Sequence, residues 1–129
     1  MGMYTEIILG AELKNDTPKN IINALKYITG IEKIKPKDFP LPDGRCEWLL
    51  QGGSCSFAIN KGLAKMWFDN IGKQWIISAR ANIKNSESEI ETFLDWLKPY
   101  IKSGSGAREM YAIVMYEEQI EPDVYYLDY

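Results

Sequence analysis

The sequence contains no histidine, and this absence excludes more chemistry than any other property of its composition. Ser-His-Asp and Cys-His catalysis need an imidazole as the general base, and most zinc and non-haem iron sites use at least one histidine ligand. A zinc site built from cysteine alone needs four thiolates, and the chain has two cysteines. The sequence also has no acidic loop with the spacing of a calcium site. We therefore expect neither a metal nor a cofactor.

The two cysteines are too few for a disulfide scaffold. Cys46 and Cys55 are also too far apart for the C-x-x-C spacing of a metal or redox motif. We predict that both are free thiols. No base lies next to Cys55 in the sequence, so its thiol is expected to stay protonated and unreactive.

Long apolar runs and an excess of positive charge are missing as well. No apolar run approaches the roughly 20 residues that a membrane-spanning helix needs, and Glu6 and Glu12 interrupt the N-terminal segment where a secretory signal would be apolar. The formal net charge of -3 disfavours binding to nucleic acid, whose backbone attracts clustered Lys and Arg. We expect a cytoplasmic protein in which residues 1–129 form one domain.

A short pattern occurs twice, seventy residues apart: residues 11–15 read Ala-Glu-Leu-Lys-Asn and residues 81–85 read Ala-Asn-Ile-Lys-Asn. Each copy follows a segment of alternating apolar and polar residues, which predicts strands over 4–14 and 73–84. Each copy precedes apolar residues at helical spacing, which predicts helices over 18–30 and 86–104. Thr17 is expected to cap the first helix, and Ser86 with Glu89 to form a capping box at the second.

The remaining segments predict further strands over 46–51, 62–69, 109–117 and 123–129, with a proline-rich loop over 31–44. A short helix over 63–68 is an alternative for one of them. The order strand, helix, strand, strand therefore occurs twice. It predicts an α+β fold in which tandem duplicated βαββ units, residues 3–70 and 72–129 approximately, form an antiparallel sheet with two helices packed on one face.

The sheet face away from the predicted helices is the first candidate site. Polar side chains on this face of the two homologous strands could orient a polar ligand. Arg80 and Asn82 are the predicted anchors, with Arg108 or an exposed aromatic residue completing the site. The predicted ligand-binding residues are Glu12, Trp67, Ser78, Arg80, Asn82 and Arg108. The alternative is the solvated face of an antiparallel sheet with a surface Arg-Glu pair.

The acidic, tyrosine-rich C-terminal segment is the second candidate site. Tyrosine buries a large area at low entropic cost, and carboxylates around it suit a basic protein partner. The predicted partner-binding residues are Tyr116, Glu117, Glu118, Tyr125 and Tyr126. The alternative is an edge strand that its charges protect from aggregation.

Several stretches resemble small, uncharacterised proteins of phages and bacterial mobile elements. These stretches are residues 4–6, 12–14 and 16–18, then 83–85, 90–91 and 99–101, and finally 116–118. The resemblance spans most of the chain and implies a biological context without a catalytic residue. The predicted order of elements is also similar to that of GyrI-like small-molecule-binding domains, in which two halves form a groove for a ligand. This second resemblance implies a binding groove between the halves.

These observations predict a non-catalytic binding protein that sequesters a small ligand or a host protein. The phage resemblance implies an inhibitor of a host defence system. Two alternatives stay open. One is an enzyme that uses carboxylate or tyrosine acid-base chemistry, with Glu12 or Glu117 as general base. The other is a structural or assembly protein, a homo-oligomer whose strand edges pair between copies.

Overall fold

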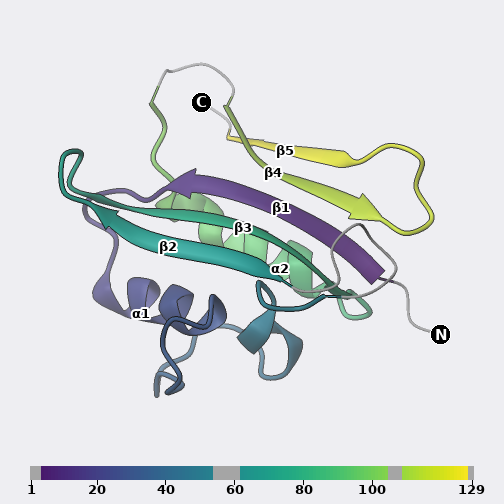
Figure 1. Ribbon diagram of the computed structural model, residues 1–129, viewed down its shortest axis with the longest axis horizontal. Coiled ribbons are helices and arrows are strands. Elements are labelled where there is room, and N and C mark those ends of the chain that lie inside the picture. Colours follow the sequence, from purple (N-terminus) through teal and green to yellow (C-terminus); the bar gives the residue numbers. More distant parts are fainter. Residues whose placement is uncertain (1–3, 54–61, 105–108, 128–129) are drawn as a thin grey trace.

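The computed structural model describes residues 4–53, 62–104 and 109–127, and within them the chain forms an α+β fold (Figure 1). Arg108 and Cys55 lie outside the described residues. The two α-helices are α1 (Lys19–Ile28) and α2 (Glu89–Leu97). The five strands are β1 (Tyr4–Glu12), β2 (Leu63–Asp69), β3 (Gln74–Lys84), β4 (Glu109–Tyr116) and β5 (Asp123–Leu127). The predicted fold class is confirmed.

The strands form one sheet in the order β2-β3-β1-β4-β5, in which all neighbours are antiparallel. Helix α1 joins β1 to β2, and β3 lies between these two strands. Helix α2 joins β3 to β4 in the same manner, and β1 lies between them. Two βαβ units are thus interleaved as in the split βαβ arrangement, and β5 extends the sheet at one edge.

The central pair β1 and β3 brings large side chains opposite small ones on the face that the helices cover. Leu9 pairs with Ala79, Ile7 with Ala81, and Ala11 with Ile77. The alanines leave room for the helices to approach the sheet closely. All of these side chains contact the core, which also takes the apolar faces of both helices.

The ends of the helices differ from the predicted caps. The Thr17 hydroxyl donates to the Lys14 carbonyl oxygen, 2.6 Å away, and Pro18 occupies the N-cap position of α1 without a side-chain cap. At α2, the Asn85 side-chain oxygen accepts a hydrogen bond from the Ile90 backbone N–H, 2.9 Å away. Both capping predictions are therefore wrong, because nearby loop groups offer these side chains and helix ends other partners.

One predicted strand is also wrong. Residues 45–48 form a 3₁₀ helix, η1 (Arg45–Trp48), followed by a turn, where the sequence suggested a strand over 46–51. The side chain of Cys46 in this short helix is buried in the core. The side chains of Leu49 and Leu50, in the turn that follows, are buried as well. A run of buried residues fits a compact helical turn as well as a strand. The first half of the described chain is therefore βαβ, whereas the second half is βαββ, and the duplication itself remains a prediction.

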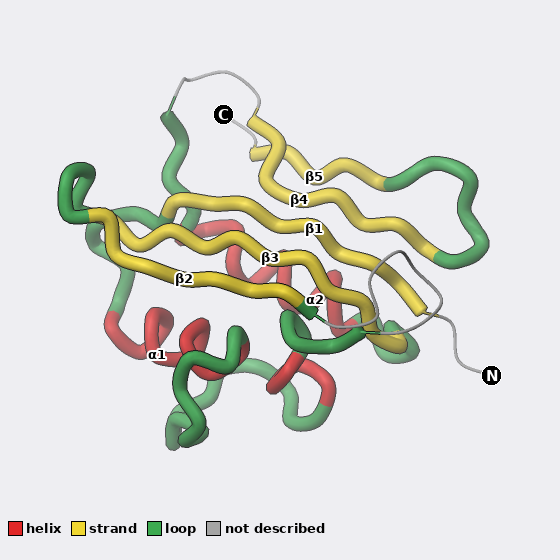
Figure 2. The backbone as a smooth tube through the Cα atoms, in the orientation of Figure 1, coloured by secondary structure: helices red, strands yellow, loops and turns green. Residues whose placement is uncertain are grey.

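Other boundaries move less. Residues 63–69 are a strand, so the alternative of a short helix there is wrong. Helix α2 ends at Leu97, and Pro99 lies in the 3₁₀ helix η2 (Lys98–Tyr100), where its missing N–H costs no α-helical hydrogen bond. The β2-β3 hairpin turns at one end of the sheet and the β4-β5 hairpin at the other (Figure 2).

Candidate functional site

The predicted ligand-binding residues of the sheet lie on its uncovered face, which we call the open face. Ser78 pairs with Gly10 across β3 and β1, and Arg80 pairs with Ile8. Trp67 of β2 and Glu12 of β1 both pair with Ile76 on this same face. The alternation read from the sequence therefore assigned the open face correctly.

Arg80 is engaged within the protein rather than free for a ligand. Its Nη2 donates to Oε2 of Glu6 at 2.9 Å, and the Glu6 side chain is only 8% exposed whereas that of Arg80 is 40% exposed. The second carboxylate oxygen of Glu6 and Nε of Arg80 are buried without a hydrogen-bond partner among the described residues. This is the Arg-Glu pair of the alternative interpretation, with the difference that one partner is buried.

The other open-face candidates do not converge on Arg80. Asn82 is buried, and its backbone N–H donates to the Gly52 carbonyl oxygen at 3.0 Å. Glu12 and Ser78 line a different cavity at the end of β1 that also includes Lys102 and Glu109. Trp67 lies exposed on β2 and does not line that cavity, although its partner Ile76 does. The predicted residues thus share a face but do not form a single site.

Tyr116 and Tyr125 of the predicted partner surface lie on the helix side of the sheet. The Tyr116 hydroxyl donates to the Glu91 carboxylate on α2, and the Asn85 amide donates to both oxygens of that carboxylate at 2.8 and 3.1 Å. Burial, followed by the hydrogen bond to Glu91, raises the pKa of Tyr116 above its usual range. The Tyr116 hydroxyl ties β4 to α2, and Tyr125 packs partly buried against the core, which leaves Glu117, Glu118 and Tyr126 as the exposed members of the set.

This network predicts a pH dependence of stability in alkaline solution. The folded protein holds the Tyr116 proton at pH values where the unfolded chain has lost it, so this stabilisation is complete below about pH 10 and declines above it. We expect the free energy of unfolding to fall by up to about 1.4 kcal/mol per pH unit for each proton concerned. Urea unfolding between about pH 9 and 11 should show a shallower decline in Tyr116→Phe than in the wild type.

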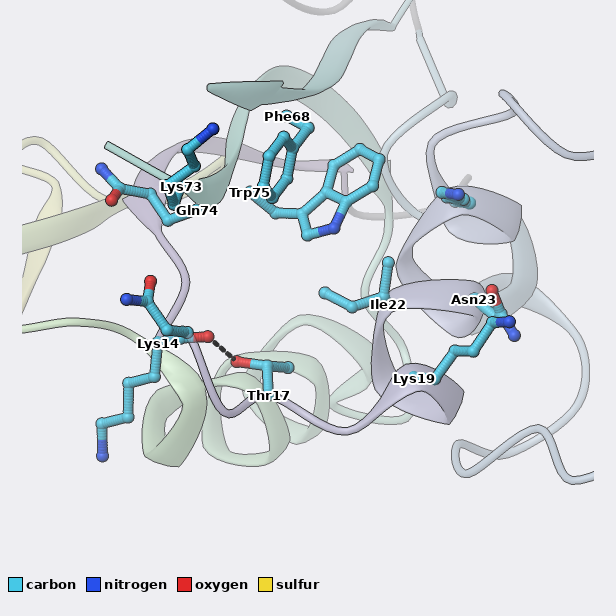
Figure 3. Close-up of a pocket in the computed structure, with 11 residues that line it drawn as sticks. Lys14, Thr17, Lys19, Ile22, Asn23, Phe68, Lys73, Gln74 and Trp75 are labelled. Carbon is cyan, nitrogen blue, oxygen red and sulfur yellow. Dashed lines mark hydrogen bonds between the residues drawn. The ribbon is translucent and has the colours of Figure 1, made fainter. Parts of the chain in front are cut away.

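The most distinctive cavity lies elsewhere, between the start of α1 and the β2-β3 hairpin (Figure 3). Its volume is about 270 Å³. Four lysines line it, together with two aromatic rings and several neutral polar side chains. The basic pocket consists of Lys14, Asn15, Thr17, Lys19, Ile22, Asn23, Lys26, Phe68, Lys73, Gln74 and Trp75. None of these described residues is acidic.

Two aromatic rings form one wall of the basic pocket. Phe68 and Trp75 meet edge to face with ring centroids 5.5 Å apart, and Nζ of Lys26 lies 4.7 Å from the centroid of the Trp75 ring. Figure 3 shows Ile22 of α1 facing these rings across the hollow. The cation-π contact holds one ammonium group against the wall. The wall thus joins an apolar surface to a fixed positive charge.

The other lysines surround the mouth of the basic pocket. Within the described part of the chain, Lys14, Lys19, Lys26 and Lys73 form no ion pair. In Figure 3 the side chains of Lys14 and Lys19 extend away from the hollow, and their flexible stems allow the ammonium groups to turn back over it. Four positive charges that line one hollow repel one another, so a bound anion would relieve the repulsion.

The N-terminus of α1 adds to the positive potential of the basic pocket. The helix has no side-chain cap and no acidic residue in its first turn, and Thr17 and Lys19 at this end both line the hollow. The first backbone N–H groups of a helix lack intrahelical acceptors and carry the positive end of its dipole. The lysines and the N-terminus of α1 therefore both favour a negatively charged ligand.

The basic pocket was not predicted from the sequence, although one signal for it was present. The stretch 17–31 contains no acidic residue, and Lys19 and Lys26 are seven residues apart, which places them on one helix face. Lys73 and Trp75 reach the same place only through the pairing of β2 with β3. Trp75 contacts the core as well as the pocket.

Comparison with known proteins does not assign this chain to a family. No protein-family model, curated protein or solved structure matches this chain. In the residues that the structure covers, none of the helices has the length and apolar character required to cross a membrane. Residues 4–53, 62–104 and 109–127 also contain no group of three or more cysteine or carboxylate side chains that could hold a metal ion.

Proposed function

We propose that this protein is a non-catalytic binding protein that sequesters a small anionic ligand in the basic pocket. The observation that carries the proposal is the gathering of Lys14, Lys19, Lys26 and Lys73 around one hollow without an acidic residue in its described lining, in a chain of net charge -3. Because these four lysines form no ion pair among the described residues, their charge is available to an anionic ligand.

The volume and the lining of the basic pocket limit the kind of ligand that it can bind. A volume of about 270 Å³ lies near the lower end for small-molecule sites, so a compact anion fits better than an extended polymer. Phe68, Trp75 and Ile22 offer apolar surface to the uncharged part of such a ligand. Asn15 and Asn23 supply neutral hydrogen-bonding groups that could fix its orientation.

The resemblance to phage and mobile-element proteins favours a role in inhibiting a host defence system. A protein that binds a ligand tightly can inhibit such a system by removing the ligand from solution, and it needs no catalytic activity to do so. The alternative of an enzyme based on Glu12 or Glu117 has less support, because both side chains are exposed and the Glu117 carboxylate accepts the Tyr4 backbone N–H at 3.0 Å.

Anion binding to the purified protein tests the proposal. Isothermal titration with inorganic phosphate, pyrophosphate and citrate at low salt should show binding, and the affinity should fall as potassium chloride is added because the lysines are near the surface. Lys26→Met keeps the aliphatic stem but removes the charge over Trp75, and we expect it to weaken binding about tenfold, which corresponds to ~1.4 kcal/mol.

Lys37→Met is the matched control, since Lys37 lies exposed in the loop after α1 and does not line the pocket. It makes the same change of net charge and should leave the affinity unchanged. Equal weakening by both variants would mean that the overall charge attracts the anion and that the pocket has no special role. Mass spectrometry of small molecules released from the purified protein would then identify the ligand itself.

A further inference from the structure

The open face carries a row of side chains that crosses the whole sheet. The strand register places Leu63 of β2 beside Arg80, Arg80 beside Ile8, Ile8 beside Ile113, and Ile113 beside Val124 of β5. Four of the five side chains in this row are apolar. The side chain of Leu63 is 62% exposed, and Ile8 and Val124 are exposed as well.

Further exposed apolar side chains flank this row. Trp67 lies on the same face four residues beyond Leu63, and Met110 pairs with Tyr126 beside the row on the β4-β5 side. Single exposed apolar side chains are common on protein surfaces, whereas a group contributed by four of the five strands is typical of an interaction surface. The helices cover only the opposite face of the sheet, so they do not shield this group.

The charges on the open face indicate the kind of partner. Arg80 is neutralised by Glu6 of the same face, at 2.9 Å. Lys65 and Asp69 of β2 lie on this face too and are opposite in sign, as are Glu12 of β1 and Lys84 of β3. A strongly charged partner would find little net charge to pair with, whereas a nearly neutral apolar surface is complementary. A second open face has these properties.

The dimensions also suit a second copy. Five strands about 4.8 Å apart, each offering roughly seven residues at about 3.4 Å, span a plane of roughly 600 Å², and side-chain relief increases the accessible area. Stable interfaces bury about 800 Å² on each partner. We propose that the open face packs against the open face of a second copy, which gives a two-fold symmetric dimer with the basic pockets on the helix sides.

The mass of the protein in solution tests this proposal. Light scattering after size exclusion, over a range of protein concentrations, should give the mass of two 14.8 kDa chains for the wild type. Leu63→Glu places a charge in the row at an edge strand, where folding tolerates it, and should weaken the dimer at least tenfold and yield a monomer. Val124→Glu, on the opposite edge strand, should do the same.

Ile34→Glu is the control, since Ile34 is 79% exposed in the loop after α1 and does not belong to the open face. It adds the same charge and should leave the dimer intact. Circular dichroism shows whether each variant is folded. Because two edge positions are substituted separately, the test still holds if one of the variants does not fold. A wild type that stays monomeric at all concentrations overturns the proposal, as does a dimer that survives both open-face variants.

Discussion

Replacing Arg80 by alanine is expected to lower the free energy of unfolding by about 2–3 kcal/mol. The reason is the burial of Glu6, whose carboxylate keeps its place between β3 and β4 when its only described ionic partner is removed. The cost is at the low end for a broken buried pair, because the Arg80 side chain is itself partly exposed. Urea unfolding at neutral pH measures the difference.

A double variant shows how much of the loss in stability comes from leaving the Glu6 charge unpaired. Glu6→Leu with Arg80→Met removes both charges and keeps side chains of similar volume, so we expect it to be within about 1 kcal/mol of the wild type. A loss equal to that of Arg80→Ala would instead show that the ion pair itself stabilises the sheet, because methionine keeps the aliphatic stem of Arg80. The comparison therefore distinguishes the cost of a buried charge left unpaired from the loss of a stabilising ion pair.

The Arg80 variant also bears on function. The sequence alone suggested Arg80 as the anchor of a ligand, so its loss was expected to abolish ligand binding. The structure engages Arg80 with Glu6, and the basic pocket lies on the helix side of the sheet. If the pocket binds the ligand, Arg80→Ala should reduce stability and leave phosphate affinity unchanged once the protein is folded.

Patterns with a strong local cause could be predicted from the sequence. The alternation along β1 and β3 assigned their two faces, because one face of each strand is buried in the core and the other is not. The apolar stripes of α1 and α2 were also predicted, and the helix expected over 18–30 ends at Ile28, close to Gly30. Gly30 has a φ of 87°, a conformation that glycine adopts without strain.

Features that depend on distant partners could not be predicted in the same way. The short helix η1 contacts α1 and α2 and buries Cys46, and the periodicity of residues 45–48 alone does not distinguish this helix from a strand. The basic pocket gathers residues from the β1-α1 connection, from α1 and from the β2-β3 hairpin, so it exists only after the sheet has formed. The engagement of Tyr116 by Glu91 depends equally on the packing of α2 against β4.

Phe93→Ala is expected to have the largest effect on stability of any variant considered. Phe93 lies on α2, is fully buried and packs against Trp96, with ring centroids 5.9 Å apart. Truncation removes the ring and leaves a cavity that the sheet and helix close only in part, at a cost of about 3–5 kcal/mol. For a domain of this size the melting temperature should fall by roughly 15 °C, which calorimetry measures.

Phe68→Ala makes the same chemical change at a position that is 41% exposed, so it serves as the matched control. It should lower the free energy of unfolding by about 1 kcal/mol, since the ring loses one edge-to-face contact with Trp75 and little burial.

The effects of these two variants on ligand binding should be the reverse of their effects on stability. Phe93 contacts the core but does not line the basic pocket, so folded Phe93→Ala should keep the phosphate affinity of the wild type. Phe68→Ala removes part of the pocket wall and should weaken ligands that carry an apolar group more than it weakens phosphate itself, because phosphate uses only the charges.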